Sequence, residues 1–92
     1  MEAIDIARKA VDIASDKQAG DIVLLDVTGI SSFTDYFVIC TGESQRQLRT
    51  ILESIRQALK DEGVLPHHEE GGIDTGWLLL DYGDAVIHLF GP

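Results

Sequence analysis

The most regular pattern of apolar and polar residues lies near the end of the chain, at residues 77–90. Two apolar runs there flank the tetrapeptide Asp-Tyr-Gly-Asp, a combination that is typical of a β-hairpin. Alternate residues of paired strands share a face of the sheet. Three registers are possible: a two-residue loop with Tyr82 opposite Ala85, another loop with Asp81 opposite Asp84, or a four-residue loop with Leu80 opposite Ala85. All three place the same residues on each face. The composition of each face can therefore be predicted.

The two faces of the predicted hairpin differ in composition. One face carries only apolar residues, namely Leu78, Leu80, Ala85, Ile87 and Leu89. The other face mixes large apolar residues with polar ones, namely Trp77, Leu79, Asp81, Val86, His88 and Phe90. We expect the first face to belong to the hydrophobic core. The second face fits two interpretations equally well: it closes the far side of the core, or it forms a surface that meets a partner.

Two other segments have apolar residues at the spacing of an amphipathic helix. The first covers residues 1–15, and we expect Gly20 to stop it. The second begins after Ser44, which forms a capping-box pattern with Gln47, and ends at Gly63. Its apolar stripe consists of Leu48, Ile51, Leu52, Ile55 and Leu59.

The remaining segments complete the predicted fold. Residues 21–27 and 35–41 are short apolar runs, which predict two strands buried on both faces, with a loop at residues 28–34. Residues 64–76 contain a proline and several glycines, which predict a loop or a brief edge strand. This order indicates an α/β (α+β) fold: a single domain over residues 1–92, with one mixed β-sheet and helices packed mainly on one face.

The charge of the chain limits the kinds of partner that it can bind. Sixteen acidic residues against seven basic residues give a net charge of −9. A protein that neutralises nucleic-acid phosphates needs clustered Lys and Arg, so little or no direct nucleic-acid binding is expected. An acidic domain is instead attracted to basic partners. We find no signal peptide or membrane span, and the single cysteine, Cys40, lies in an apolar run; both observations favour a cytoplasmic location.

The sequence contains no clear catalytic, cofactor or metal site. The Gly42-Glu43-Ser44 step resembles the phosphate-binding helix start of nucleotidyltransferases. Those enzymes also need two carboxylates that bind metal ions, usually from an Asp-x-Asp or similar pair on one strand. No acidic residue of this chain is followed by another two positions later. The run His67-His68-Glu69-Glu70 suggests metal ligands, but adjacent side chains of an extended chain diverge. We expect Cys40 to be a buried, unreactive thiol. The residues therefore predict a small acidic binding domain that is not an enzyme.

The order and spacing of several motifs closely resemble the ribosomal silencing factor (RsfS, Iojap-like) family. The motifs are residues 21–27, 35–42, 44–47, 70–71 and 77–84, followed by residues 88–90. The resemblance implies a nucleotidyltransferase-like fold without the catalytic residues, and binding to large-subunit ribosomal protein fourteen on the 50S subunit. It also implies a steric block to joining with the 30S subunit, which represses translation in starvation or stationary phase. Family members usually continue past the last strand, so we expect the chain, which ends at Gly91-Pro92, to lack the family's C-terminal tail.

We expect the mixed face of the hairpin to be the partner-binding surface. Trp77 would be its apolar anchor, and Asp81 and Asp84 would pair with Lys or Arg of the ribosomal protein. The other expected contact residues are Leu79, His88 and Glu70. Two alternatives stay open: an assembly factor of the large subunit that uses the same docking site, and, less favoured, a minimal nucleotidyltransferase. A bare sheet face could also form a homodimer.

Overall fold

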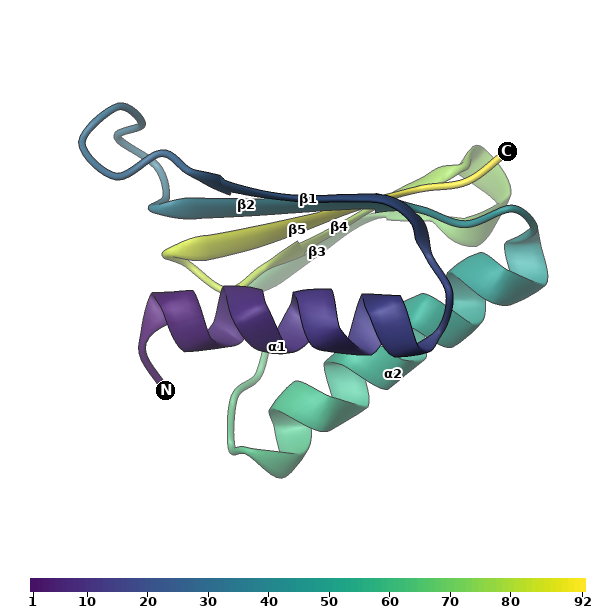
Figure 1. Cartoon of the computed structure of the whole chain (residues 1–92), viewed down its shortest axis with the longest axis horizontal. Coiled ribbons are helices and arrows are strands. Elements are labelled where there is room, and N and C mark those ends of the chain that lie inside the picture. The colour runs from purple at the N-terminus through teal and green to yellow at the C-terminus, as the bar shows by residue number, and fades with distance from the viewer.

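The computed structural model of the protein describes all 92 residues and has two helices on one face of a five-stranded sheet (Figure 1). The elements in chain order are α1 (Ala3–Asp16), β1 (Gly20–Asp26), β2 (Tyr36–Thr41), α2 (Gln45–Asp61), β3 (His68–Gly72), a 3-10 turn η1 (Ile73–Thr75), β4 (Trp77–Asp81) and β5 (Ala85–Phe90).

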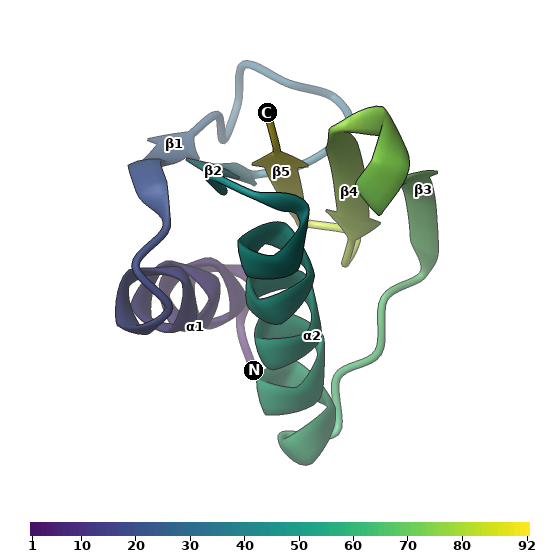
Figure 2. The same cartoon turned by 90° about the vertical axis from the view of Figure 1, so that its right-hand side faces the viewer.

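The strands form one mixed sheet in the order β1-β2-β5-β4-β3. β2 and β5 are parallel, and the other neighbouring strands are antiparallel. Figure 2 shows both α-helices below the sheet and neither of them above it. The predicted mixed sheet with helices on one face is therefore confirmed, and the opposite face is open.

The hydrophobic core lies between the sheet and the two helices. The predicted apolar stripe of α2 is buried, with Leu48, Ile51, Ile55 and Leu59 fully covered and Leu52 at 6% exposure. α1 contributes small side chains to the core, namely the fully buried Ala7, Ala10 and Ala14. Their small size allows α1 to pack closely against α2 and the sheet. Burial of each large side chain stabilises the fold by about 1.5–3 kcal/mol. Neither helix has the length and apolar composition to cross a membrane.

The start of α2 agrees with the predicted capping box. The hydroxyl of Ser44 accepts a hydrogen bond from the backbone N–H of Gln47 at 3.0 Å, and the side-chain oxygen of Gln47 accepts one from the N–H of Glu43 at 2.6 Å. The side-chain amide of Gln47 also donates to the carbonyl oxygens of Lys17 and Gln18, at 3.3 and 2.9 Å. One side chain therefore caps α2 and links it to the end of α1.

The predicted stop of α1 was wrong. Gly20 is the first residue of β1, and the helix ends at Asp16. Between α1 and β1, the residue with left-handed backbone is Gln18, at φ 62°. A residue with a side chain adopts this conformation at some energetic cost, and the hydrogen bond from Gln47 to the Gln18 carbonyl helps to hold it there.

The prediction that β1 is buried on both faces was also wrong. Its side chains Ile22 and Leu24 pack against the core, but Val23 and Leu25 are 41% and 42% exposed. β1 is an edge strand, and no helix covers the open face above it. In β2, Val38 and Cys40 are buried on the helix side, whereas Ile39 on the other side is only partly buried.

The segment at residues 64–76 forms the brief edge strand that was one of two predicted outcomes. β3 pairs with β4, and Gly71 within it has a left-handed φ of +84°. A Cβ atom on Gly71 would lie only 2.1 Å from the carbonyl oxygen of Trp77 and 3.1 Å from its ring carbon Cε3. Only glycine fits at this position, and its absence of a side chain makes room for Trp77.

Candidate functional site

The hairpin of β4 and β5 has one of the predicted registers, with a two-residue loop. Tyr82 donates its backbone N–H to the carbonyl of Ala85 at 2.9 Å, and Leu79 lies opposite His88. The five residues predicted for the core face are all buried, at no more than 8% exposure. The mixed residues therefore lie on the opposite side of the sheet, away from both helices.

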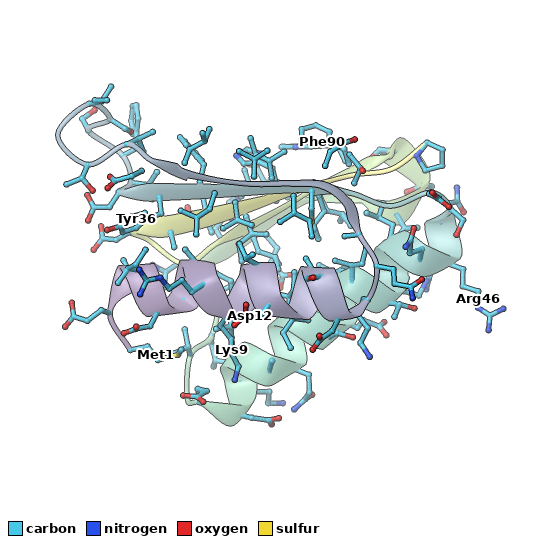
Figure 3. The ribbon with its side chains drawn as sticks, viewed as in Figure 1. Met1, Lys9, Asp12, Tyr36, Arg46 and Phe90 are labelled. Atoms are coloured by element: carbon cyan, nitrogen blue, oxygen red, sulfur yellow. The ribbon has the colours of Figure 1, made fainter.

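We call this opposite side of the sheet the open face. The strand registers and the alternation along each strand define its members. They are Val23, Leu25, Phe37, Ile39, Thr41, His68, Glu70, Trp77, Leu79, Asp81, Val86, His88 and Phe90. Figure 3 shows the side chain of Phe90 pointing away from the helices, and Phe90 is 38% exposed.

The residues of the open face form rows across the sheet. The middle row runs from Val23 on β1 through Ile39, His88 and Leu79 to Glu70 on β3. The first four strands of this row supply apolar or aromatic side chains, and the charged residue stands at the β3 edge. An apolar centre with a polar rim is the usual composition of a protein–protein interface.

An aromatic cluster occupies the centre of the open face. The ring of His88 lies 5.5 Å from that of Phe37, tilted by 53°, and 6.3 Å from that of Phe90, nearly parallel at 8°. Burial lowers the pKa of His88 from the ordinary value of 6.5, because the charged form loses hydration. At neutral pH the cluster is therefore uncharged. Trp77 on β4 lies opposite Phe90 in the strand register.

Charge is divided unequally between the two layers of the molecule. Residues 18–44 and 62–92, which contain all five strands, have ten acidic residues and no Lys or Arg, a net charge of −10. Residues 1–17 and 45–61, which contain both helices, have seven basic and six acidic residues, a net charge of +1. The whole acidic excess of the chain therefore belongs to the sheet and its loops.

The structure brings five of the six predicted contact residues onto the open face. Leu79 and His88 lie side by side in its middle row, and Glu70 lies next to Leu79. Glu70 also forms an ion pair with His68 at 2.9 Å when that histidine is protonated. Trp77 stands at the far end of β4, about 13 Å from the start of the turn at ~3.3 Å per residue.

The two aspartates near the turn have different surroundings. Asp81 accepts a hydrogen bond from the backbone N–H of Gly83 at 2.7 Å, which fixes the turn. Asp84 lies in the turn itself, outside the strands, and is exposed. Asp84 is therefore the freer of the two carboxylates for contact with a partner.

The histidine and glutamate run at residues 67–70 divides between the two faces of the sheet. His68 and Glu70 point to the open face, whereas Glu69 forms an ion pair with Arg56 of α2. The pKa of the nearby Tyr82 is raised to about 12, mainly by burial and to a smaller extent by the charge of Glu69. Adjacent side chains of the run diverge, as predicted for an extended segment.

Cys40 lies on the helix side of β2 and is fully buried, as predicted. Burial raises the pKa of its thiol to about 11, so the thiol stays protonated at neutral pH. A protonated, inaccessible thiol is a poor nucleophile. Cys40 therefore has a packing role.

The predicted site omitted the part of the open face that β1 and β2 supply. Phe37 and Ile39 alternate with the buried residues of β2, and in β1 the exposed Val23 and Leu25 alternate with the partly buried Ile22 and Leu24. This two-residue period was present in the sequence. The missing information was that β2 lies parallel to β5, since a crossover through α2 joins strands that are far apart in the chain.

Comparisons with known proteins agree with this architecture. The model of the family described as "Ribosomal silencing factor during starvation" matches residues 1–92. Ribosomal silencing factor RsfS of Bacillus subtilis is 38% identical over 90 residues, which cover 98% of this chain and 76% of that protein. The mouse protein named "Mitochondrial assembly of ribosomal large subunit protein 1" is 33% identical over 85 residues, 89% of this chain and 37% of that protein.

A solved structure shares the fold. A crystal structure of a protein from Chromobacterium violaceum superposes with a TM-score of 0.91 at 33% identity, covering 100% of this chain and 77% of that one. The match of the family model over the full length, the sequence relatives and the shared fold agree with one another. The chain therefore belongs to the ribosomal silencing factor family.

Proposed function

We propose that the open face binds large-subunit ribosomal protein fourteen on the 50S subunit, and that the bound protein blocks joining with the 30S subunit. This is a repressor of translation that acts by binding, with no enzymatic step. The observation that carries the proposal is an exposed apolar sheet face in a layer with ten acidic residues and no basic residue. Family membership supports the ribosome as the target.

The charge of the sheet layer favours a basic protein over nucleic acid as the direct contact. Phosphate groups would meet only carboxylates on this layer, and no Lys or Arg would compensate them. A partner rich in Lys and Arg would gain favourable long-range attraction, which raises the association rate and fixes orientation. A basic ribosomal protein fits this requirement.

The apolar part of the open face would supply most of the affinity. Buried aromatic anchors dominate the energetics of interfaces, and Trp77 is the largest side chain here, next to Phe90. Glu70 and Asp84 would stand at the rim, where charges add specificity more than affinity.

Repression would follow from the volume of the bound protein. The molecule measures 34 × 27 × 21 Å along its principal axes. If its sheet lies on the subunit-facing side of the ribosomal protein, both helices project into the space that the 30S subunit must occupy. No contact with the 30S subunit is needed for this effect.

A subunit-joining assay tests the proposal. Purified 30S and 50S subunits are mixed with increasing protein, and the 70S fraction is measured by light scattering and on sucrose gradients. The proposal predicts fewer 70S particles, with the protein found only on free 50S subunits. Gln57→Ala, on the outer side of α2, should act like the wild type. Wild-type protein bound to intact 70S particles would contradict the steric block.

A role in assembly of the large subunit is the second candidate, and the name of the mouse relative favours it. The same docking surface would serve both roles, so binding measurements do not separate them. Ribosomal particles from cells that lack the protein do: accumulated 50S precursors indicate assembly, and normal subunits indicate silencing.

A homodimer through the open face is a further use of the same apolar surface. Two such faces in contact would bring two layers of charge −10 together, so the dimer should be weak at low salt and should strengthen as salt is added. Analytical ultracentrifugation at two salt concentrations measures this, and a tight dimer at low salt would contradict it.

A further inference from the structure

The loop between β1 and β2, residues 27–35, exposes two large apolar side chains. Ile30 is 84% exposed and Phe33 is 89% exposed, more than any other large apolar residue of the chain. Figure 1 shows this loop rising from the end of the sheet on the side opposite the helices, and Figure 2 shows it arching above the strands. The loop therefore stands beside the open face.

Hydrogen bonds hold the base of this loop in place. Val27 donates its N–H to the carbonyl of Asp35 at 2.8 Å, which closes the loop. The N–H groups of Asp35 and Tyr36 both donate to the carbonyl of Asp84, at 3.0 and 3.1 Å. The loop is thus attached to the turn between β4 and β5 as well as to its own strands.

The tip of the loop is also ordered by internal hydrogen bonds. The left-handed Gly29, at φ +79°, provides the sharp turn that it needs. The bonds run from the N–H of Thr28 to the carboxylate of Asp26 (2.9 Å), from Ile30 and Ser31 to the carbonyl of Val27 (2.9 and 3.0 Å), and from Phe33 to the hydroxyl of Ser31 (3.1 Å). A segment with this many bonds presents its two apolar side chains in a fixed arrangement, which lowers the entropy lost on binding.

The exposed apolar residues of the chain are concentrated around this loop. Seven large apolar residues are exposed in the whole molecule, and four of them lie between residues 23 and 33. On the open face, Leu25 lies next to Phe37, and Phe37 next to Val86, so an apolar row begins two residues from each end of the loop. The loop and the open face therefore form one continuous surface.

The charges around the loop indicate what it can contact. Asp26, Asp35 and Asp84 surround its base, and no Lys or Arg lies anywhere in the sheet layer. Hydrogen bonds from Thr28 lower the pKa of Asp26, the backbone N–H having the larger effect and the side chain the smaller one. The carboxylate of Asp26 therefore stays ionised at neutral pH. RNA and a second copy of this acidic loop would both be repelled, whereas a basic protein would be attracted.

We propose that Ile30 and Phe33 form a second apolar contact with the same basic ribosomal protein, at the opposite end of the surface from Trp77. This inference rests on the proposed function and extends the docking surface to β1 and its loop. Contacts at both ends fix the partner's orientation, because a single anchor would leave it free to rotate. The loop thereby helps to determine which surface of the partner is recognised.

Calorimetry with isolated ribosomal protein fourteen tests the inference. The double variant Ile30→Ser, Phe33→Ser should raise the Kd at least tenfold, equal to about 1.4 kcal/mol. Leu65→Ser is the matched control, because Leu65 is 61% exposed and lies in the connection from α2 to β3, away from the open face. Its Kd should stay within twofold of the wild type.

The outcomes separate this inference from the proposed function. Wild-type protein that fails to bind the ribosomal protein would refute both. Tight wild-type binding that the double variant retains would overturn the role of the loop alone. Because both side chains are solvent-exposed, the variant should keep the wild-type melting temperature. If it does not, the single variants Phe33→Ser and Phe33→Leu are compared instead. Phe33→Leu keeps an apolar side chain and should bind like the wild type, whereas Phe33→Ser should bind more weakly.

Discussion

The two faces of the sheet are built from the same strands and from similar apolar side chains, but only one of them is covered. On the helix side, Leu80, Ile87 and Leu89 are fully buried. On the open face, Leu25 and Phe90 are 42% and 38% exposed, although they are no less apolar. Apolar side chains on a strand therefore do not by themselves identify core. Whether they are core depends on what the rest of the chain places over them.

Charge separates the two layers more sharply than hydrophobicity does. The helical segments carry both signs, and Lys9 of α1 forms an ion pair at 3.8 Å with Glu62, the residue that follows α2. The sheet layer carries only negative charge. A face that is apolar at its centre and acidic around it is suited to a basic protein, and a balanced outer layer is suited to solvent. Substitutions in the two layers and on the two faces should therefore have different effects on stability and on binding.

The largest contrast should be between neighbours on β4. Leu80→Ala removes a fully buried side chain and should lower the free energy of unfolding by about 3 kcal/mol. Leu79→Ala, on the open face, should lower it by about 1 kcal/mol but weaken binding to the ribosomal protein. Urea denaturation and calorimetry measure the two effects. Equal losses of stability would mean that the open face is packed like core.

Gly71 should be intolerant of any side chain. Gly71→Ala would place a Cβ 2.1 Å from the backbone oxygen of Trp77 at a left-handed φ, and should cost about 2–3 kcal/mol of stability. Gly83→Ala is the matched control: its φ is also positive, but its Cβ would meet only the side chain of His67, at 3.0 Å. Its loss should be about 1 kcal/mol. Similar urea midpoints for the two variants would contradict the close contact with Trp77.

Trp77 should dominate the affinity of the open face. Trp77→Ala should weaken binding to ribosomal protein fourteen by about 2 kcal/mol or more, roughly 30-fold in Kd. Circular dichroism first establishes that the variant is folded, and calorimetry then gives the Kd. An unchanged Kd would remove Trp77 from the interface.

His88 should make stability depend on pH in the acidic range. Its pKa in the folded protein lies below the ordinary 6.5, so the unfolded chain binds more protons between those two values. The contribution of neutral His88 to the free energy of unfolding is therefore complete above pH 6.5. It is lost as the pH falls towards the pKa of His88 in the folded protein. Urea unfolding at pH 7.5 and 5.0 should show a larger acid-induced loss for the wild type than for His88→Gln. Identical losses would show that His88 is not desolvated.

The smallest effect should come from a rim charge. Asp84→Asn should lower the association rate with the ribosomal protein by about two- to threefold at low salt, and the difference should disappear at high salt. Glu53→Gln removes one negative charge from the outside of α2 and should change the rate less. Stopped-flow measurements compare them. A larger effect from Glu53 would place the partner on the helix side.

Local features of the fold could be predicted from the sequence, and long-range features could not. The hairpin faces and the cap at Ser44 depend on neighbouring residues, and both predictions were confirmed. The exposure of Val23 depends on where α1 and α2 pack, which an unbroken apolar run does not reveal. The left-handed Gln18 depends on an amide that comes from Gln47, far along the chain.

The same distinction applies to the candidate site. Leu79 and His88 were found together because they belong to one hairpin. Phe37 joins them only through the parallel pairing of β2 with β5, which the chain makes after crossing over through α2. Phe33 was assigned to an ordinary loop, since no periodic pattern distinguishes an exposed apolar side chain from a covered one.

Methyl NMR can show which face of the sheet binds the ribosomal protein, because it reports on both faces in one experiment. Labelled protein is titrated with ribosomal protein fourteen, and the methyl shifts of the two faces are compared. If the open face binds the partner, we expect large shifts or broadening on that face, at Val23, Leu25, Ile39, Leu79 and Val86, and small changes on the helix side, at Ile51, Ile55, Ile87 and Leu89. Changes centred on the methyl groups of the helix side, with the open face unaffected, would contradict it.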